Sequence, residues 1–252
     1  KAAASERGMV FFSTATNSIT LGWLAALDAE LYKLASPNLT HLPLIREVAA
    51  LGRPVIVSTG MAGMTEIDEA VQAFVAAGNR RLALLHCTSE YPASPESLNL
   101  RAIQTLAAAF PFPIGFSDHS LDGGTAVAAV VLGARVVEKH LTLDRGQVGP
   151  DHHYALEPDD FIRMGQSIRF VERSLGDGHK TPTAGERDKA TAYWRSLHAA
   201  RDLPTGHVLK PDDIVVVRPN DGLHPRNFDA VVGMRLTRPL SAGHPLNWLH
   251  LK

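Results

Sequence analysis

The stretches IGFSDHS (Ile114–Ser120) and RVVEKH (Arg135–His140) each hold a short apolar run that ends in a histidine, His119 or His140. An apolar run that breaks into polar residues is typical of a buried strand whose last residues reach a polar site. The alanine- and valine-rich segment between the two runs, Gly124–Leu132, has the spacing of a helix. The pattern therefore predicts a strand, a helix and a strand, and the ends of such strands carry the chemistry in barrel enzymes.

Strand and helix patterns alternate in the same way along the first 175 residues. Six apolar strands are predicted, at Met9–Ser13, Leu31–Ala35, Pro54–Ser58, Leu82–Cys87, Ile114–Ser117 and Arg135–His140. Helical spacing follows each of them, at Ile19–Ala29, Leu42–Leu51, Met64–Ala77, Leu98–Phe110, Gly124–Leu132 and Pro158–Leu175. This alternation predicts an α/β fold with a parallel sheet, and it favours a TIM-type (β/α)8 barrel of which the chain contains six of the eight strands.

The amino-acid composition changes after the last of these helices. Residues 176–195 are polar and rich in Gly, Pro and Thr, which predicts a linker. Residues 196–252 hold two strand-like runs, IVVVRP (Ile214–Pro219) and AVVGMRL (Ala230–Leu236), between turn-rich connections. We therefore expect a partial barrel over 1–175, a linker over 176–195 and a small β-rich domain over 196–252.

The composition excludes several classes of function. The chain has 252 residues, 45% hydrophobic and 20% charged, and a formal net charge of -1, which gives no general attraction to nucleic acid or to an anionic membrane. No apolar run is long enough to predict a transmembrane helix. The single cysteine, Cys87, is expected in a buried strand and suits a reducing compartment such as the cytoplasm. The helix-like start KAAASERG lacks an initiating methionine, so we expect upstream residues to be missing.

His119 and His140 are predicted at the ends of neighbouring parallel strands, which would bring both imidazoles to one rim of the sheet. Two imidazoles with oxygen donors suit a divalent metal that keeps open positions for a substrate, such as manganese, zinc or iron. Histidines that only form hydrogen bonds near a strand end would produce the same spacing. That alternative stays open on the spacing alone.

Lys33 interrupts the apolar strand LYKLAS, where a buried lysine is costly unless it meets a negative group. A phosphate or carboxylate ligand, a buried acidic side chain or a position at the rim would each explain it. Hydroxyl side chains at the same end of several strands favour an oxyanion site. They are Ser13, Thr14, Ser36, Ser58, Thr59, Thr88, Ser89 and Ser117.

Four further polar residues are ambiguous. Asp118 and Glu138 lie next to or near the histidines in sequence, and we favour structural roles for both. Asp151 follows the last strand in a Gly-Pro loop and could hold a substrate hydroxyl or be a solvated acid. Tyr91, in SEYPASP, has the same two interpretations.

Taken together, the motifs resemble the sialic acid synthase family, which includes the pseudaminate, legionaminate and spore-coat polysaccharide synthases. The resemblance runs in order through FFST (Phe11–Thr14), YKLAS (Tyr32–Ser36), GRPVIVSTGMA (Gly52–Ala62), ALLHCTSEYPASPESLNLRAI (Ala83–Ile103), GFSDHS (Gly115–Ser120) and ALEPDDF (Ala155–Phe161). The segment from RSLHAARDLPTG to VVGMRL is similar to the antifreeze-like (SAF) domain of that family.

The resemblance implies condensation of phosphoenolpyruvate with the aldehyde of an N-acetylated amino sugar such as N-acetylmannosamine, with release of phosphate. It implies a divalent metal on His119 and His140, with Mn²⁺ expected and Mg²⁺ or Co²⁺ as alternatives, that acts as a Lewis acid. Arg218 would reach the sugar from the C-terminal domain of a partner subunit, in a domain-exchanged homodimer. By the same resemblance Lys33, Thr14, Ser36, Ser89 and Ser117 would bind phosphoenolpyruvate, and Tyr91 and Asp151 would bind the sugar.

Two departures from the family pattern bear on activity. Asn38 stands at a catalytic position that is usually acidic, and an amide cannot act as a general base near neutral pH. The first two barrel strands of the family have no counterpart here, so we expect this chain alone to have weak or no activity. The rival hypotheses are a catalytically silent, truncated sugar-binding or interaction protein of the same family, and an aldolase-type barrel with a Schiff base on Lys33.

Overall fold

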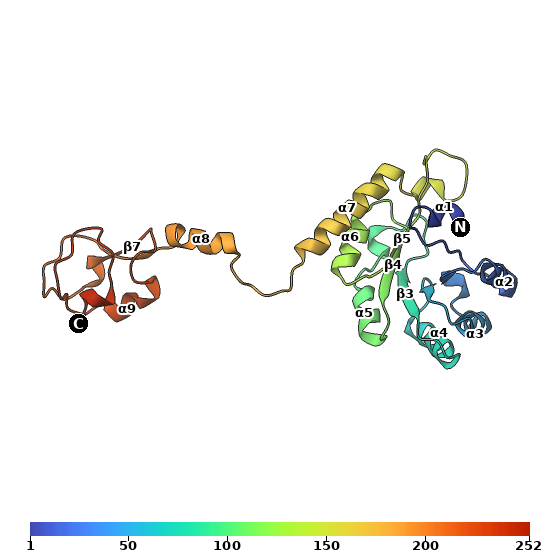
Figure 1. Cartoon of the computed structure of the whole chain (residues 1–252), viewed down its shortest axis with the longest axis horizontal. Coiled ribbons are helices and arrows are strands. Elements are labelled where there is room, and N and C mark those ends of the chain that lie inside the picture. Colours follow the sequence, from blue (N-terminus) through green and yellow to red (C-terminus); the bar gives the residue numbers. More distant parts are fainter. The chain divides into compact units, whose positions relative to one another are not determined.

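The computed structural model describes the whole chain, Lys1–Lys252. The chain divides into two units, Lys1–Asp177 and Gly178–Lys252 (Figure 1). The first unit contains a five-stranded parallel sheet, and the second contains a two-stranded antiparallel sheet.

The five strands of the first unit lie side by side in the order in which they occur along the chain. They are β1 (Tyr32–Leu34), β2 (Val55–Ser58), β3 (Leu82–Cys87), β4 (Ile114–Asp118) and β5 (Val137–Lys139). The sheet curls as part of a barrel does, with helices along its outside (Figure 1). The predicted fold class, a partial β/α barrel followed by a small β-containing domain, is confirmed.

The strand expected at Met9–Ser13 does not form, so the sheet has five strands instead of six. Only Thr14 makes a bridge, a parallel one to Lys33 of β1. The apolar side chains of Met9 and Val10 are 55% and 49% exposed, so little burial stabilises an extended segment here. A segment that meets one neighbour at a single bridge lacks the continuous ladder of a strand.

Helices connect and cover the strands. They are α1 (Ala2–Ser5), α2 (Ser18–Ala26), α3 (Leu42–Ala50), α4 (Met64–Ala76), α5 (Ala102–Ala109), α6 (Gly124–Val131) and α7 (Pro158–Ser174), with 3-10 turns η1 (Ser36–Asn38), η2 (Pro95–Ser97) and η3 (His152–Tyr154). The six predicted helices all occur. The helix expected from Leu98 begins only at Ala102, after Asn99 with its positive φ of 41°. No helix combines the length and apolar character needed to cross a membrane.

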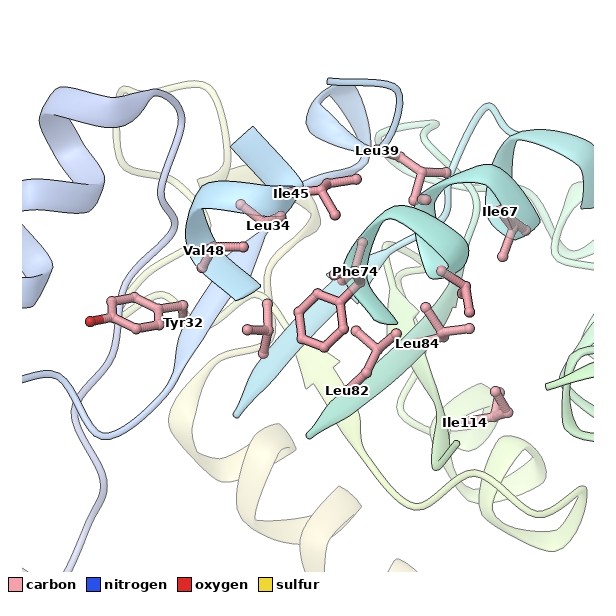
Figure 2. Packing of buried hydrophobic residues seen from close by; sticks show 14 of the residues in the cluster. Tyr32, Leu34, Leu39, Ile45, Val48, Ile67, Phe74, Leu82, Leu84 and Ile114 are labelled. Carbon is pink, nitrogen blue, oxygen red and sulfur yellow. The ribbon is translucent and has the colours of Figure 1, made fainter. Parts of the chain in front are cut away.

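Alternation of side chains along the strands divides the sheet into two chemically different faces. Leu34 of β1 and Leu84 of β3 point to the helices and pack with Val48 of α3 and Phe74 of α4 (Figure 2). Each of these four side chains is at most 1% exposed. Because successive side chains point to opposite faces, the residue between Tyr32 and Leu34, Lys33, points to the concave face of the sheet.

The second unit is built on β6 (Ser196–Ala199) and β7 (Ile214–Val217), which pair antiparallel. Its other elements are α8 (Ala184–Tyr193), α9 (Phe228–Val231), η4 (Pro211–Asp213), η5 (Pro225–Asn227) and η6 (Trp248–His250). Leu197, Val231, Leu236 and Leu246 are fully buried in its core.

Two details of the second unit differ from expectation. The run AVVGMRL is not a strand, because its first residues end α9, Gly233 turns the chain with φ of 89°, and only Arg235 and Leu236 form isolated bridges. The predicted linker contains α8, which a capping box between Thr183 and Glu186 starts.

We expect Phe74→Ala to lower the free energy of unfolding of the first unit by about 3–5 kcal/mol, because it leaves a cavity between the sheet and α4. Ile162→Ala, at a site on α7 that is 56% exposed, is the matched control and should change it by less than about 0.5 kcal/mol. Urea unfolding followed by circular dichroism measures both. Equal effects of the two substitutions would contradict the packing described here.

Candidate active site

A cavity of about 240 Å³ lies at the carboxyl ends of the strands, on the concave face of the sheet. Residues that belong to or follow each of the five strands contribute to its wall. The lining residues are Thr14, Lys33, Ala35, Ser36, Pro37, Ser58, Cys87, Tyr91, Ser117, His119, Glu138 and His140. The structure thus brings together Thr14, Lys33, Ser36, Tyr91, Ser117 and both histidines, as the sequence predicted.

Lys33 supplies the positive charge of this cavity. It is 5% exposed, and its Nζ donates to the backbone oxygen of Leu34 at 2.9 Å and to Ser58 Oγ at 2.7 Å. Burial lowers the pKa of the amine, and the nearby carboxylate of Glu138 opposes that shift. The Lys33 Nζ and Glu138 Oε2 atoms are 3.6 Å apart. A lysine held in this way is a preformed anchor for an anionic group.

Glu138 is a cavity residue to which the sequence interpretation assigned a structural role. Its Oε1 accepts a hydrogen bond of 2.7 Å from Ser117 Oγ, while Oε2 faces Lys33. A signal for this placement was present in the sequence, because Glu138 is two residues before His140 and therefore shares its face of β5. Glu138 links the lysine to the strand that carries His119.

His119 presents one free ring nitrogen. Its Nδ1 lies 2.7 Å from the backbone oxygen of Thr88, which can only accept, so Nδ1 carries a proton and Nε2 keeps its lone pair. Burial lowers the pKa of the imidazole, against the opposing effect of the Thr88 carbonyl. The side chain is therefore held neutral in one tautomer, which is the form that binds a metal.

His140 lies near His119, Tyr91, Asp151 and Tyr154, whose ring centroid is 4.9 Å from that of His140. The two imidazole centroids are 5.4 Å apart, and Tyr91 lies 4.2 Å from the His119 ring and 6.3 Å from the His140 ring. Burial and the neighbouring His119 lower the pKa of His140, while Asp151 opposes the shift. Asp151 Oδ2 is 3.8 Å from His140 Nδ1, and its Oδ1 accepts a bond of 2.6 Å from Tyr154.

The hydroxyl groups on the other side of the cavity crowd around one glycine. Gly60 N–H donates to Ser36 Oγ at 3.0 Å, and a Cβ on Gly60 would lie 2.3 Å from Ser89 Oγ. Ser89 Oγ is buried and has no hydrogen-bond partner. A buried hydroxyl without a partner is costly, so Ser89 is a donor available to a bound oxyanion.

The two histidines fit a divalent metal by the chemistry of their donor atoms. Both imidazoles are held toward the neutral form, and their rings converge on the same cavity. The structure contains no cluster of three or more His, Cys, Asp or Glu side chains arranged as metal ligands. A pair of imidazoles suits a metal that completes its coordination with substrate and water.

Four predicted site residues are not part of the cavity wall: Ser89 and Asp151, whose contacts are described above, and Asn38 and Arg218. Asn38 lies in η1, where its Nδ2 donates to the backbone oxygen of Ala15 at 3.3 Å. Arg218 belongs to the second unit, where its guanidinium lies 5.4 Å from the ring centroid of Tyr193.

Asp118 and Lys139 form a buried ion pair beside the cavity. The Asp118 Oδ2 and Lys139 Nζ atoms are 3.0 Å apart, and both side chains are at most 1% exposed. Thr125 Oγ1 and Ser120 N also donate to the Asp118 carboxylate. The structural role expected for Asp118 agrees with these contacts, which fix the strand ends that carry His119 and His140.

The curled β/α sheet carries a buried lysine, a row of hydroxyls and two histidines at its carboxyl edge, which is where barrel enzymes place their active sites. Residues 1–180 match the model of the NeuB family, and residues 195–252 match the SAF domain. The chain therefore belongs to the NeuB family, with a C-terminal SAF domain.

Several relatives have stated activities or solved structures. The N,N'-diacetyllegionaminic acid synthase of Legionella pneumophila is 38% identical over 253 residues, which cover 99% of this chain and 71% of the relative. The spore coat polysaccharide biosynthesis protein SpsE of Bacillus subtilis is 36% identical with a TM-score of 0.67, over 100% of this chain and 75% of that one. The sialic acid synthetase of Leptospira borgpetersenii, solved with citrate, is 34% identical with a TM-score of 0.71, and the match covers 75% of this chain and 66% of that one.

The pKa shifts of the histidines predict a pH dependence of stability. The pKa values of His119 and His140 are lowered in the folded state, so the unfolded state binds more protons as the pH falls. The free energy of unfolding of the metal-free protein should therefore decrease as the pH falls below about 6.5, the ordinary histidine value. His119→Asn together with His140→Asn should flatten this dependence in urea unfolding between pH 5 and 8. An unchanged slope would contradict the neutral state of the two rings.

Proposed function

We propose that the chain is the synthase part of a nonulosonic acid synthase. The proposed reaction condenses phosphoenolpyruvate with the aldehyde of an N-acetylated amino sugar such as N-acetylmannosamine. The observation that carries this proposal is the cavity that joins Lys33 and several hydroxyls to two neutral histidines. The names of the legionaminic acid and sialic acid synthases among its relatives support the class of product.

The lysine side of the cavity is the proposed phosphoenolpyruvate site. Lys33 provides the buried charge, and Ser89 provides a hydroxyl that needs a partner. Ser36 Oγ is held at the Gly60 N–H, which leaves its own proton free to donate to an oxyanion. Thr14 and Ser117 complete the row of hydroxyls around the same space.

The histidine side is the proposed metal and aldehyde site. A bound divalent metal, for which we propose Mn²⁺, would polarise the aldehyde oxygen as a Lewis acid. The Thr88 carbonyl orients His119 so that Nε2 faces the cavity, and burial keeps both rings unprotonated. Tyr91 lies over the His119 ring, and Asp151 faces His140, so these two residues are the proposed contacts to the sugar.

The proposed reaction balances in three steps. C3 of phosphoenolpyruvate forms a bond to the aldehyde carbon of the sugar, whose oxygen becomes a hydroxyl. Water adds at C2, and the C2–O bond to phosphate then breaks, which releases inorganic phosphate and leaves the 2-keto acid. We also propose that Arg218 reaches the sugar from the SAF domain of a partner subunit in a homodimer, and that the enzyme works in the cytoplasm.

Because residues 1–252 alone are expected to have weak or no activity, the direct test uses the full-length protein. It is incubated with Mn²⁺, phosphoenolpyruvate and a panel of N-acetylated hexosamines, and inorganic phosphate is measured. His119→Ala and His140→Ala should each lower kcat/KM at least about a thousandfold, about 4 kcal/mol. His41→Asn, which retains a capping side chain at the start of α3, is the control and should stay within about twofold. No phosphate release with any of the sugars would refute the proposal.

The lowered pKa of Lys33 also favours a second candidate, a Schiff-base aldolase, because a neutral amine is the nucleophile in that chemistry. Borohydride added with pyruvate would trap a covalent adduct on Lys33 in that case. The synthase proposal predicts no adduct detectable by mass spectrometry.

Asn38 motivates the other alternative, a protein that binds the sugar without turning it over. Calorimetry that detects sugar binding without phosphate release, both unchanged by Asn38→Glu, would favour this alternative over the synthase.

A further inference from the structure

Ser196, His198 and Asp221 form a polar cluster in the core of the second unit. Ser196 and His198 lie on β6 and are 0% and 4% exposed, whereas the Asp221 side chain is 46% exposed. Asp221 belongs to the turn Pro219–Gly222, which directly follows Arg218. The cluster therefore joins the buried strand to the segment that carries the arginine.

The hydroxyl of Ser196 forms hydrogen bonds to both ends of this turn. Its Oγ accepts a bond of 3.0 Å from Gly222 N–H and lies 2.7 Å from the backbone oxygen of Pro219, to which only the hydroxyl can donate. A Cβ at Gly222 would lie 2.7 Å from the Leu197 oxygen, so the turn is pressed against β6. One buried hydroxyl thus holds the turn in contact with the strand.

The hydrogen-bond partners of His198 define its protonation. Nδ1 lies 2.8 Å from the backbone oxygen of Gly243, which can only accept, so Nδ1 carries a proton. Nε2 lies 2.9 Å from Ser196 Oγ and 3.1 Å from Asp221 Oδ1.

A neutral ring does not satisfy this arrangement. If Nε2 were unprotonated, the Ser196 hydroxyl would have to donate to it instead of to the Pro219 oxygen, which would then lose its partner. The Asp221 carboxylate would also lie beside the lone pair of Nε2. With a proton on Nε2, every group in the cluster has a partner of the right kind.

We propose that His198, protonated on both ring nitrogens, is a positioning residue that holds the Pro219–Gly222 turn and thereby the side chain of Arg218. The consequence for catalysis rests on the proposed function of Arg218 as a sugar contact. Arg218 is exposed and lies over the Tyr193 ring, and the next turn residue, Asn220, donates its N–H to the Thr191 oxygen at 2.8 Å. The turn is the part of the chain that connects Arg218 to the buried cluster.

No other charged group competes for His198. Arg195, which precedes β6, donates to the Val216 oxygen, and β7, which pairs with β6, contains no titratable side chain. Asp213, which precedes β7, is bound by Arg201 and His207. The ring of His244, in the segment that contacts β6, faces His250. Asp221 is therefore the charged group that faces the imidazole.

The protonation can be measured without any assay of activity. In the full chain labelled with ¹⁵N-histidine, both ring nitrogens of His198 should show imidazolium shifts at pH 7, and Asp221→Asn should convert Nε2 to the unprotonated type. A neutral His198 ring at pH 7 in the wild-type chain would overturn the proposal.

The coupling to Arg218 is tested in the same sample. His198→Asn keeps the bond to Gly243 but cannot reach Ser196 and Asp221. It should speed hydrogen exchange of the Gly222 amide at least tenfold and shift the Arg218 Nε signal near Tyr193. His207→Gln, which removes a His–Asp contact of 2.7 Å elsewhere in the unit, is the matched control and should do neither. Unchanged Gly222 and Arg218 signals in His198→Asn would overturn the positioning role.

Kinetics connect this cluster to the proposed function. His198→Asn should raise the KM for the amino sugar about tenfold with little change in kcat, and should have less than a twofold effect in an Arg218→Ala background. Equal effects in both backgrounds would mean that His198 does not act through Arg218. If the full-length wild-type protein shows no synthase activity, the proposed function fails, and the two spectroscopic tests still decide whether His198 holds the turn.

Discussion

The alternation of side chains along five parallel strands is the constraint on which the rest of the structure depends. Each strand buries one face against helices, so its apolar residues must recur at every second position. The positions between them face the concave side of the sheet, where a polar residue is tolerated only near the open carboxyl end. Lys33, Ser117 and Glu138 occupy such positions on β1, β4 and β5. Strand register places Ser117 beside Glu138, and the curl of the sheet brings Lys33, on the opposite edge strand, to 3.6 Å from the same carboxylate.

Burial on this face determines the charge states of the site. A lysine with few water contacts needs hydrogen bonds from its ammonium group, and the Leu34 oxygen and Ser58 provide them. The same loss of water lowers the pKa of His119 and of His140, so the cavity combines a buried lysine with two imidazoles that favour the neutral form. The ion pair of Asp118 and Lys139 lies on the outer face of the same strand ends and links β4 to β5 there. The chemistry and the fold therefore depend on the same strand ends.

The sequence predicted five of the strands and the six main helices because their apolar spacing is strong. It also predicted the gathering of Lys33, His119 and His140, since each ends or interrupts an apolar run. The prediction of strands from the sequence failed where the local apolar pattern and the burial in the structure disagree. Met9–Ser13 is apolar but lies largely exposed, and the run AVVGMRL divides at Gly233. The place of Glu138 in the cavity was missed because a charged residue in a strand fits a salt bridge equally well, although its spacing from His140 put both side chains on one face of the sheet. The partners of Asn38 and His198 depend on contacts distant in sequence, which no local pattern reveals.

The most direct test of the account is pulsed electron paramagnetic resonance of Mn²⁺ bound to the ¹⁵N-histidine-labelled protein. The account predicts hyperfine coupling to two imidazole nitrogens, reduced to one in His119→Ala and in His140→Ala. It also predicts that adding phosphoenolpyruvate changes the manganese spectrum only when Lys33 is present. A spectrum without histidine coupling, or one that neither substitution changes, would contradict the claim that the carboxyl ends of β4 and β5 hold the metal.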